Sequence, residues 1–226
     1  RVVGGINDAS TTVTVNFYER FVRGAVLATT AKTAEMVKLT ENSSRDVQIA
    51  FANELSMICE TENISTWEVI ALANRHPRVN ILQPGPGVGG HCISVDPWFI
   101  VDRSPQHSKL IRTAREVNDA KPHWVIERVK RHAEKFKAPV IACLGLAFKA
   151  DVDDLRESLA SDIVKSLDQQ GVGKLLVCEP NLKSHKDFNL VSIDQAIDQA
   201  YIILLLVDHK QFKGLKTGEL NEKILV

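Results

Sequence analysis

The chain has 226 residues, with 28 Lys plus Arg against 28 Asp plus Glu and a hydrophobic content of 44%. This length suits one or two globular domains, and the balanced charge excludes the basic surface of a nucleic-acid-binding protein or of a protein that binds an anionic membrane. No apolar run approaches the roughly 18 residues that a membrane-spanning helix needs. The four cysteines are widely separated, which disfavours a disulfide framework and a zinc or other metal site, and indicates the reducing cytoplasm.

Residues 1–31 are too few to form a domain by themselves. The sequence predicts a helix that starts with Asp8 as its N-cap and runs to Phe21, followed by a β-strand over residues 25–30. No Gly-x-Gly-x-x-Gly loop follows a predicted strand anywhere in the sequence. The usual dinucleotide-binding loop is therefore not part of these 226 residues.

Residues 32–60 predict one long helix whose apolar side chains lie on more than one face. Such a helix needs partners on several sides, and we expect it to form the core of a homodimer. Lys38, Asn42 and Arg45 form a polar stripe, because spacings of four and seven return to within about 40° of one direction at 100° per residue. A solvated face is the ordinary explanation of such a stripe, and periodicity alone leaves both interpretations open.

The most informative stretch is residues 83–98, QPGPGVGGHCISVDPW. So many Gly and Pro residues disfavour both helix and strand, so this segment should be an irregular loop whose backbone can approach a ligand closely. It leads to Cys92, with Asp96 four residues later. Cysteine is a strong nucleophile where its surroundings favour the thiolate, although a lone cysteine is more often a small buried hydrophobe.

Helices are predicted around this loop as well. Ser65 and Glu68 form a capping-box pattern that starts a helix running to about residue 74. After the loop, one helix is predicted over residues 105–117, and another restarts at Pro122, because proline is tolerated in the first turn of a helix.

After about residue 138 the hydrophobic period changes. Strands are predicted at residues 140–145, 174–178 and 201–207, alternating with helices near 163–167 and 193–200, and the final residues are strand-like. This alternation indicates βαβ units and a parallel sheet. The expected fold class is therefore α/β: an all-helical central region, residues 32–120, followed by a Rossmann-like parallel-sheet domain, residues 121–226. Ligands of such sheets bind beyond the carboxyl ends of the strands, where Lys149 and Arg156 fall.

The pattern Gly-x-Gly-x-Gly-Gly-x-Cys, with an Asp four residues after the Cys, resembles the active-site loop of the nucleotide-sugar 6-dehydrogenases, the family that includes the UDP-glucose and GDP-mannose enzymes. Within this family, the runs at residues 74–80 and 95–99 are most similar to the bacterial branch that oxidises UDP-N-acetyl-D-mannosamine. The likeness covers almost the whole chain. Val95 stands where the UDP-glucose branch has Lys, which argues against UDP-glucose as the substrate.

The resemblance implies roles for individual residues. Cys92 would be the covalent nucleophile, Asp96 would position or deprotonate water, and Lys38 with Asn42 would stabilise an oxyanion. Substrate contacts are implied for Arg1, Val2, Arg45, His76, Arg78, Gly89, Phe148 and Lys149, and Arg156 would reach the cofactor NAD. His76 has an alternative as a loop histidine with a structural hydrogen bond, and Asp153 and Asp154 are interpreted as acidic residues that complement a helix dipole.

The resemblance also implies an activity: NAD-dependent four-electron oxidation of C6 of UDP-N-acetyl-D-mannosamine to the uronic acid, for bacterial surface polysaccharide precursors. Family members carry an NAD-binding domain upstream, of which residues 1–31 would be the tail, so these 226 residues alone should bind UDP-sugar weakly and form no NADH. Three alternatives stay open: a UDP-N-acetylglucosamine 6-dehydrogenase, an inactive nucleotide-sugar-binding and dimerisation module, and a β-hydroxyacid dehydrogenase relative. The last would share the Lys-x-x-x-Asn pair but has no reason to carry the Cys92 loop.

Overall fold

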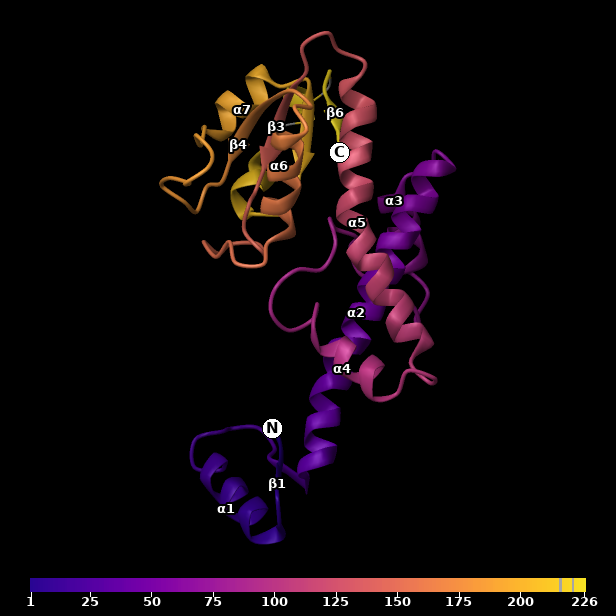
Figure 1. Ribbon diagram of the computed structural model, residues 1–226, viewed down its shortest axis with the longest axis vertical. Helices are drawn as coiled ribbons and strands as arrows, with labels where there is room; N and C mark the ends of the chain where they lie inside the picture. Colours follow the sequence, from indigo (N-terminus) through magenta and orange to yellow (C-terminus); the bar gives the residue numbers. More distant parts are fainter. Residues whose placement is uncertain (216, 221) are drawn as a thin grey trace.

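The computed structural model describes residues 1–215, 217–220 and 222–226 and consists of three parts joined by two long helices (Figure 1). The first part is a small unit in which β1 (Val2–Gly5) pairs in parallel with β2 (Leu27–Thr30). The helix α1 (Asp8–Tyr18) connects the two strands. The predicted N-cap of α1 was wrong. Asn7 caps the helix, because its backbone is extended and its Oδ1 accepts a hydrogen bond from Ser10 N at 2.9 Å.

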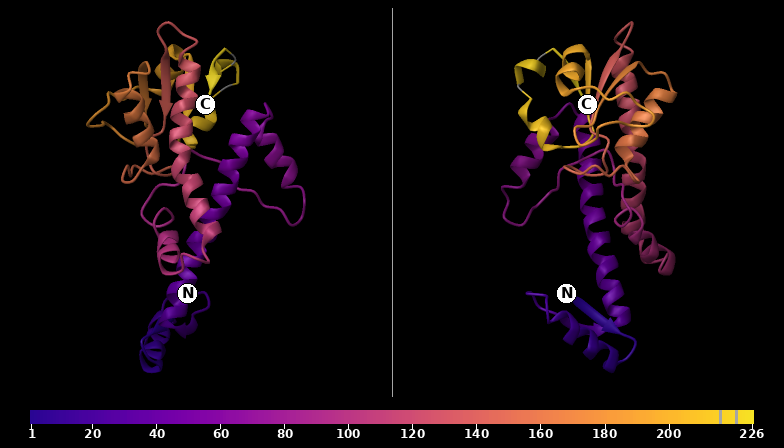
Figure 2. Two further views of the ribbon diagram at one scale, coloured as in Figure 1. Left: turned by 45° about the vertical axis from the view of Figure 1, so that its right-hand side comes forward. Right: turned by 90° about the vertical axis from the view of Figure 1, so that its left-hand side faces the viewer.

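The second part is helical, as predicted. It contains α2 (Ala31–Thr61), α3 (Thr66–Ala73), α4 (Asp96–Arg103) and the first half of α5 (Lys109–Ala133). The predicted long helix is confirmed as the single helix α2, which packs along α5 (Figure 1). Figure 2 shows the β1–α1–β2 unit beyond the N-terminal end of α2. The sequence pattern gave no sign of α4, which starts directly after the Gly/Pro-rich segment of residues 83–95, called the glycine loop below.

The prediction of two separate helices on either side of Pro122 was wrong, because α5 passes through this residue without a break. Proline has no N–H, so the carbonyl of Asn118 loses its partner in the helix. The glycine loop crosses α5 at this place: a Cβ built on Gly87 would lie 2.9 Å from Asn118 O and 3.2 Å from Pro122 Cδ. The boundary predicted between residues 120 and 121 lies inside α5, which joins the two regions directly.

The third part is a four-stranded parallel sheet with the order β4-β3-β5-β6. Its strands are β3 (Val140–Leu144), β4 (Lys174–Cys178), β5 (Ile202–Leu205) and β6 (Ile224–Leu225). One face packs against α5 and α6 (Leu159–Gln169), and the other against α7 (Ile193–Gln199), the 3₁₀ helix η1 (Lys210–Gly214) and α8 (Thr217–Leu220). The predicted α/β class, with a helical central region before a parallel sheet, is confirmed. Among the helices described, none is long and apolar enough to cross a membrane.

The junction between α2 and α5 is polar, which the sequence pattern did not predict. Arg115 Nη1 donates to Asp46 Oδ1 at 2.7 Å, and both side chains are almost fully buried. Asn118 Nδ2 donates to the same oxygen at 2.8 Å, and Asn53 Nδ2 donates to Asn118 Oδ1 at 2.9 Å. Burial raises the pKa of Asp46, and Arg115 opposes that rise. Loss of one partner would leave a buried charge unpaired, so this network fixes the alignment of the two helices.

Candidate active site

Three of the residues predicted to be catalytic form a hydrogen-bonded chain between α2 and α4. Lys38 Nζ donates to Asn42 Oδ1 at 3.1 Å, and Asn42 Nδ2 donates to Asp96 Oδ2 at 2.5 Å. Asn42 is buried, whereas the Lys38 side chain is 62% exposed. The four-residue spacing on α2 aligns Lys38 with Asn42, and the start of α4 brings Asp96 to them. These hydrogen bonds therefore hold an ammonium, an amide and a carboxylate together at one edge of the glycine loop.

Cys92 lies in the turn that leads into α4. Its carbonyl accepts hydrogen bonds from Val95 N at 3.0 Å and Asp96 N at 2.8 Å. This turn fixes the backbone of Cys92 relative to Asp96 and so to the Lys38–Asn42 pair. Ser94 Oγ closes the turn further by donating to Gly90 O.

The four cysteines have different environments. Cys59, Cys143 and Cys178 are buried, and Cys92 is exposed. Burial raises the pKa of the Cys143 thiol to about 12, and burial together with the neighbouring Glu179 carboxylate raises the pKa of the Cys178 thiol to about 11. Since the thiolate is the nucleophile, Cys143 and Cys178 are held in an unreactive form. A solute can reach the thiol of Cys92.

The glycine loop is anchored to both halves of the chain. On one side Gly85 N donates to Asn53 Oδ1 at 2.8 Å, which connects the loop to the buried network of α2 and α5. On the other side Gly90 N donates to Glu157 O at 3.0 Å. A Cβ on Gly89 would lie 2.4 Å from that same carbonyl oxygen, so only glycine permits this approach. Backbone N–H groups of the loop thus bond to a side chain of the central region on one side and to a backbone carbonyl of the domain with the sheet on the other.

Phe148 and Lys149, both predicted to contact substrate, lie beside this loop. A Cβ on Gly90 would be 3.5 Å from Phe148 Cδ2, so the ring lies next to the backbone one residue before His91. Lys149 Nζ lies 5.6 Å from the centroid of the Phe148 ring. Both side chains are exposed. The structure thus brings the ring of Phe148, with Lys149 next to it, from the loop between β3 and α6 to the backbone of Gly90.

Arg156, the predicted cofactor contact, pairs with Asp154 on the surface. Its Nη2 lies 2.7 Å from Asp154 Oδ2 and its Nε donates to Oδ1 at 2.9 Å. These hydrogen bonds hold the pKa of Asp154 well below its usual range, with a smaller contribution from His91. This pairing differs from the interpretation of Asp154 as a residue that only complements a helix dipole. The Arg156 side chain is 76% exposed, so an anionic ligand can reach it.

The other predicted substrate residues are not brought into this cluster by any contact that the structure describes. His76 Nδ1 accepts from Arg78 N at 3.3 Å within an exposed loop, the structural hydrogen bond that was the alternative for His76. Arg45 is exposed on α2. Arg1 and Val2 lie at β1, where Arg1 O accepts from Leu27 N at 2.7 Å. Their contacts with substrate stay predictions.

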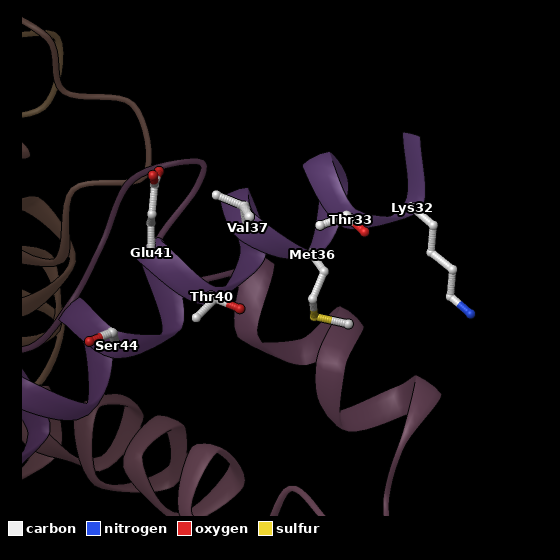
Figure 3. A pocket seen from close by; sticks show the side chains of 7 residues that line it. All are labelled: Lys32, Thr33, Met36, Val37, Thr40, Glu41 and Ser44. Carbon is white, nitrogen blue, oxygen red and sulfur yellow. The ribbon is translucent and has the colours of Figure 1, made fainter. Parts of the chain in front are cut away.

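A hollow with a volume of about 600 Å³ lies away from the site. It lies along α2 (Figure 3) and is lined by Lys32, Thr33, Met36, Val37, Thr40, Glu41 and Ser44. All of these residues come from one helix, and none is a predicted site residue. The hollow is a shallow depression on a helix face, whereas the site is an open cluster around the glycine loop.

Sequence reasoning found Asn42 but missed Asp46 and Asn53, two buried polar residues further along the same helix. Asn42, Asp46 and Asn53 follow one another on α2 with spacings of four and seven, the spacings of a single helix face. All three are buried. A polar stripe extended to residues 46 and 53 would have been the signal, because polar groups buried together on a helix require partners.

Comparisons with known proteins identify the family that carries this glycine loop, this lysine–amide–carboxylate arrangement and this parallel sheet. The central-domain model of the UDP-glucose/GDP-mannose dehydrogenase family matches residues 32–120. The model of the UDP-binding domain of that family matches residues 142–225. The chain belongs to the UDP-glucose/GDP-mannose dehydrogenase family, which confirms the resemblance found in the sequence.

Several relatives are similar over most or all of the chain. An NDP-N-acetyl-D-galactosaminuronic acid dehydrogenase of Ralstonia nicotianae is 56% identical over the whole chain. A UDP-N-acetyl-D-mannosamine dehydrogenase of Campylobacter jejuni is 52% identical over 94% of it. The structure of a UDP-N-acetyl-mannosamine dehydrogenase from Staphylococcus aureus superposes with a TM-score of 0.86 at 42% identity, covering 99% of this chain and 53% of that one. The chain spans about half the length of the curated relatives, 54% for the first two.

Proposed function

We propose that the full-length protein oxidises C6 of UDP-N-acetyl-D-mannosamine to the carboxylate in two hydride transfers, with NAD as the acceptor. The observation that carries this proposal is the hydrogen-bonded chain from Lys38 through Asn42 to Asp96, next to the exposed thiol of Cys92. The names of relatives that are 49–52% identical support the substrate. The product would supply surface polysaccharide synthesis in the cytoplasm, where the thiol stays reduced.

Cys92 provides the route from aldehyde to acid. Loss of a hydride from C6 and of the hydroxyl proton converts the alcohol to an aldehyde. The thiolate then adds to that carbon, and the oxygen takes up a proton to form a thiohemiacetal. This adduct is tetrahedral and carries oxygen, so a second hydride can leave together with the hydroxyl proton, and a thioester remains. Water attacks the thioester, releases the carboxylate and returns the thiol. The covalent bond retains the reactive aldehyde between the two oxidations.

The residues around the thiol have separate roles in this scheme. Asp96 orients or deprotonates the attacking water. Lys38 supplies positive charge to the oxygen that becomes negative when sulfur or water adds to the carbonyl carbon. Asn42 holds Lys38 and Asp96 in place, since its oxygen accepts from the ammonium of Lys38 and its nitrogen donates to the carboxylate of Asp96.

Phosphate and cofactor recognition would use exposed cations. Lys149 beside the glycine loop suits the diphosphate of the sugar nucleotide, and Phe148 offers an apolar face for its base or sugar. NAD, when bound, accepts the hydrides that leave C6. Of the residues in this chain, Arg156 fits a contact with it, because the guanidinium is exposed and its planar fork matches a phosphate.

We also propose that two copies of the chain associate through α2. Met36, Phe51 and Ile58 are 45%, 58% and 52% exposed on this helix. Their positions fall within about 60° of one another at 100° per residue, so they form a mainly apolar stripe along α2, which also contains the exposed Glu54. The hollow around Met36 lies on the same stripe (Figure 3). An exposed apolar face of this length suits an interface.

The test is NADH formation by the full-length protein with a panel of UDP- and GDP-sugars. We expect two NADH per sugar with UDP-N-acetyl-D-mannosamine and little with UDP-glucose. The 56% identity to the Ralstonia relative makes the N-acetyl-D-galactosamine series the second candidate, and UDP-N-acetylglucosamine is the third. Binding of UDP without NADH from any sugar would refute the enzyme and support a nucleotide-sugar-binding module.

A further inference from the structure

The carboxyl edge of the sheet contains a buried pair of ionisable side chains that the proposed reaction does not use. Glu179 directly follows β4, and His209 lies beyond β5. Both side chains are fully buried, and His209 Nε2 lies 3.1 Å from Glu179 Oε2. Burial of such groups is unfavourable unless each polar atom has a partner. The partners of this pair therefore indicate its role.

Glu179 accepts hydrogen bonds from the start of the loop between β3 and α6. Its Oε2 accepts from Leu146 N at 2.7 Å and Ala147 N at 3.1 Å, and its Oε1 accepts from Asn181 N at 3.0 Å. In a dinucleotide-binding domain, backbone amides at this position face the pyrophosphate. Here the carboxylate occupies the anion position. A ligand phosphate therefore has to be recognised by groups further along the loop, such as Lys149.

His209 holds the other end of the same loop. Its Nδ1 accepts from Asp151 N at 2.9 Å and from Asn181 Nδ2 at 3.0 Å. Because a backbone N–H can only donate, Nδ1 carries no proton, so the proton is on Nε2 and is donated to Glu179. Asp151 has a φ of 62°, which is unfavourable for a residue with a side chain. The bond to His209 stabilises this conformation.

We propose that Glu179 and His209 are positioning residues for substrate recognition, and that they act by fixing the backbone of residues 146–151 at both ends. Phe148 and Lys149 lie between the two fixed ends. This inference rests on the proposed function, in which those two side chains contact the UDP-sugar. Neither Glu179 nor His209 touches the substrate, because both are fully buried.

Two variants of the full-length protein test the pair. Glu179→Gln removes the negative charge and sets an amide N–H₂ group against one of the N–H donors. His209→Phe keeps a ring of similar size while removing the acceptor for Asp151 N. Leu167→Ala is the matched control, because this fully buried residue lies in the last turn of α6, in the core of the same domain and outside the loop.

Three measurements are made on each variant: hydrogen exchange of residues 146–151, the Kd of UDP, and the Michaelis constants for UDP-sugar and NAD. Glu179→Gln and His209→Phe should speed exchange in this loop and weaken UDP binding about tenfold or more, since a small misplacement of a recognition group has a large effect. The KM for NAD should stay within about twofold of wild type. Leu167→Ala should lower the melting temperature and leave the Kd of UDP unchanged.

A double-mutant cycle adds a readout that a merely structural role would not move. In a Lys149→Ala background, Glu179→Gln should weaken UDP binding much less than in wild type. The reason is that Glu179 acts on UDP binding by positioning Lys149, which is already absent in this background. Additive losses, unchanged exchange, or an equal loss in Leu167→Ala would overturn the proposal. Lack of NADH formation by the wild-type protein would instead refute the proposed function, since exchange and UDP binding do not require turnover.

Discussion

Asn42 Nδ2 donates a hydrogen bond to Asp96 Oδ2 at 2.5 Å, although 54 residues separate the two side chains in sequence. The oxygen of the same amide accepts from Lys38 Nζ at 3.1 Å. Because the oxygen of this amide accepts and its nitrogen donates, only one of the two flipped orientations of the amide satisfies both hydrogen bonds. This contact connects α2 to the first residue of α4, and so to the turn that carries Cys92. The long helix and the glycine loop form one site.

Asn42→Asp should therefore remove most activity without unfolding the protein. The new carboxylate would face Asp96, and like charges at hydrogen-bond distance repel, which turns Asp96 away from its position. We expect kcat to fall by roughly 100-fold or more, the scale seen when a group that stabilises a transition state is lost. Steady-state NADH formation measures it. Gln48→Glu, a similar change at an exposed position of α2, is the control. A kcat within twofold of wild type would contradict this assignment.

Gly89→Ala should disturb the contact between the glycine loop and the domain with the sheet. The added Cβ would lie 2.4 Å from Glu157 O, which is too close for any real contact. We expect a loss of about 1–3 kcal/mol in the free energy of unfolding, as for other overpacked sites, and a higher KM for UDP-sugar. Denaturant unfolding and kinetics measure the two effects. Gly24→Ala is the control, because a Cβ there meets nothing within 4 Å. Equal stability of both variants would refute the close approach.

The buried Lys121 should make the free energy of unfolding depend on pH in the alkaline range. Burial lowers its pKa from 10.5 to about 8, with a further contribution from Arg128. Between these two values the unfolded chain binds the proton more strongly than the folded chain, so stability rises with pH from about 8 to about 10.5. The gain should reach about 3 kcal/mol over this interval.

The measurement for Lys121 is the free energy of unfolding against pH for wild type and Lys121→Met. The variant should lack this rise, because methionine has no titrating group. Lys109→Met, at an exposed position near the start of the same helix, serves as the control and should keep the wild-type profile. Parallel profiles for wild type and Lys121→Met above pH 8 would show that Lys121 titrates alike in the folded and unfolded states.

The apolar stripe on α2 predicts a homodimer at micromolar concentration. Phe51→Glu would place a charge in the middle of the stripe and should shift the protein toward monomer. Gln48→Glu adds the same side chain outside the stripe and should leave the dimer intact. Sedimentation velocity distinguishes the two species. A monomeric wild-type protein at micromolar concentration would rule out this interface.

The elements with strong local patterns could be predicted from sequence. The 31-residue helix α2 and the strands β3, β4 and β5 follow directly from hydrophobic period and chain order. Other elements were missed, among them the strand β1 (Val2–Gly5), the helix α4 and the continuous form of α5. Helix α4 starts immediately after a glycine-rich loop and has only eight residues. Helix α5 continues through Pro122, because its packing against α2 and the sheet outweighs the missing hydrogen bond.

The candidate site was predictable only in its parts. Residue spacing aligned Lys38 with Asn42, and the loop pattern singled out Cys92 and Asp96. The contact between Asn42 and Asp96 depends on tertiary packing that a local pattern does not contain. The same holds for Asp46 and Arg115, whose pairing at 2.7 Å joins two helices across 69 residues of sequence.

If Cys92 is the covalent nucleophile, Cys92→Ala in the full-length protein should block the step from aldehyde to acid. Acid formation should fall by roughly three orders of magnitude or more. The melting temperature and the binding of UDP-sugar should be retained, because an exposed thiol is lost from a loop held by backbone contacts. Cys59→Ala and Cys143→Ala should show the opposite pattern, losing about 1 kcal/mol or more of stability because these side chains are buried, while acid formation continues.

The decisive measurement is uronic acid produced per minute by Cys92→Ala, with thermal melting of the same samples in the presence and absence of UDP-sugar. We expect no acid above background from a folded protein that UDP-sugar still stabilises. Normal acid formation by Cys92→Ala, or an equal loss in Cys59→Ala and Cys143→Ala, would show that Cys92 is not the nucleophile.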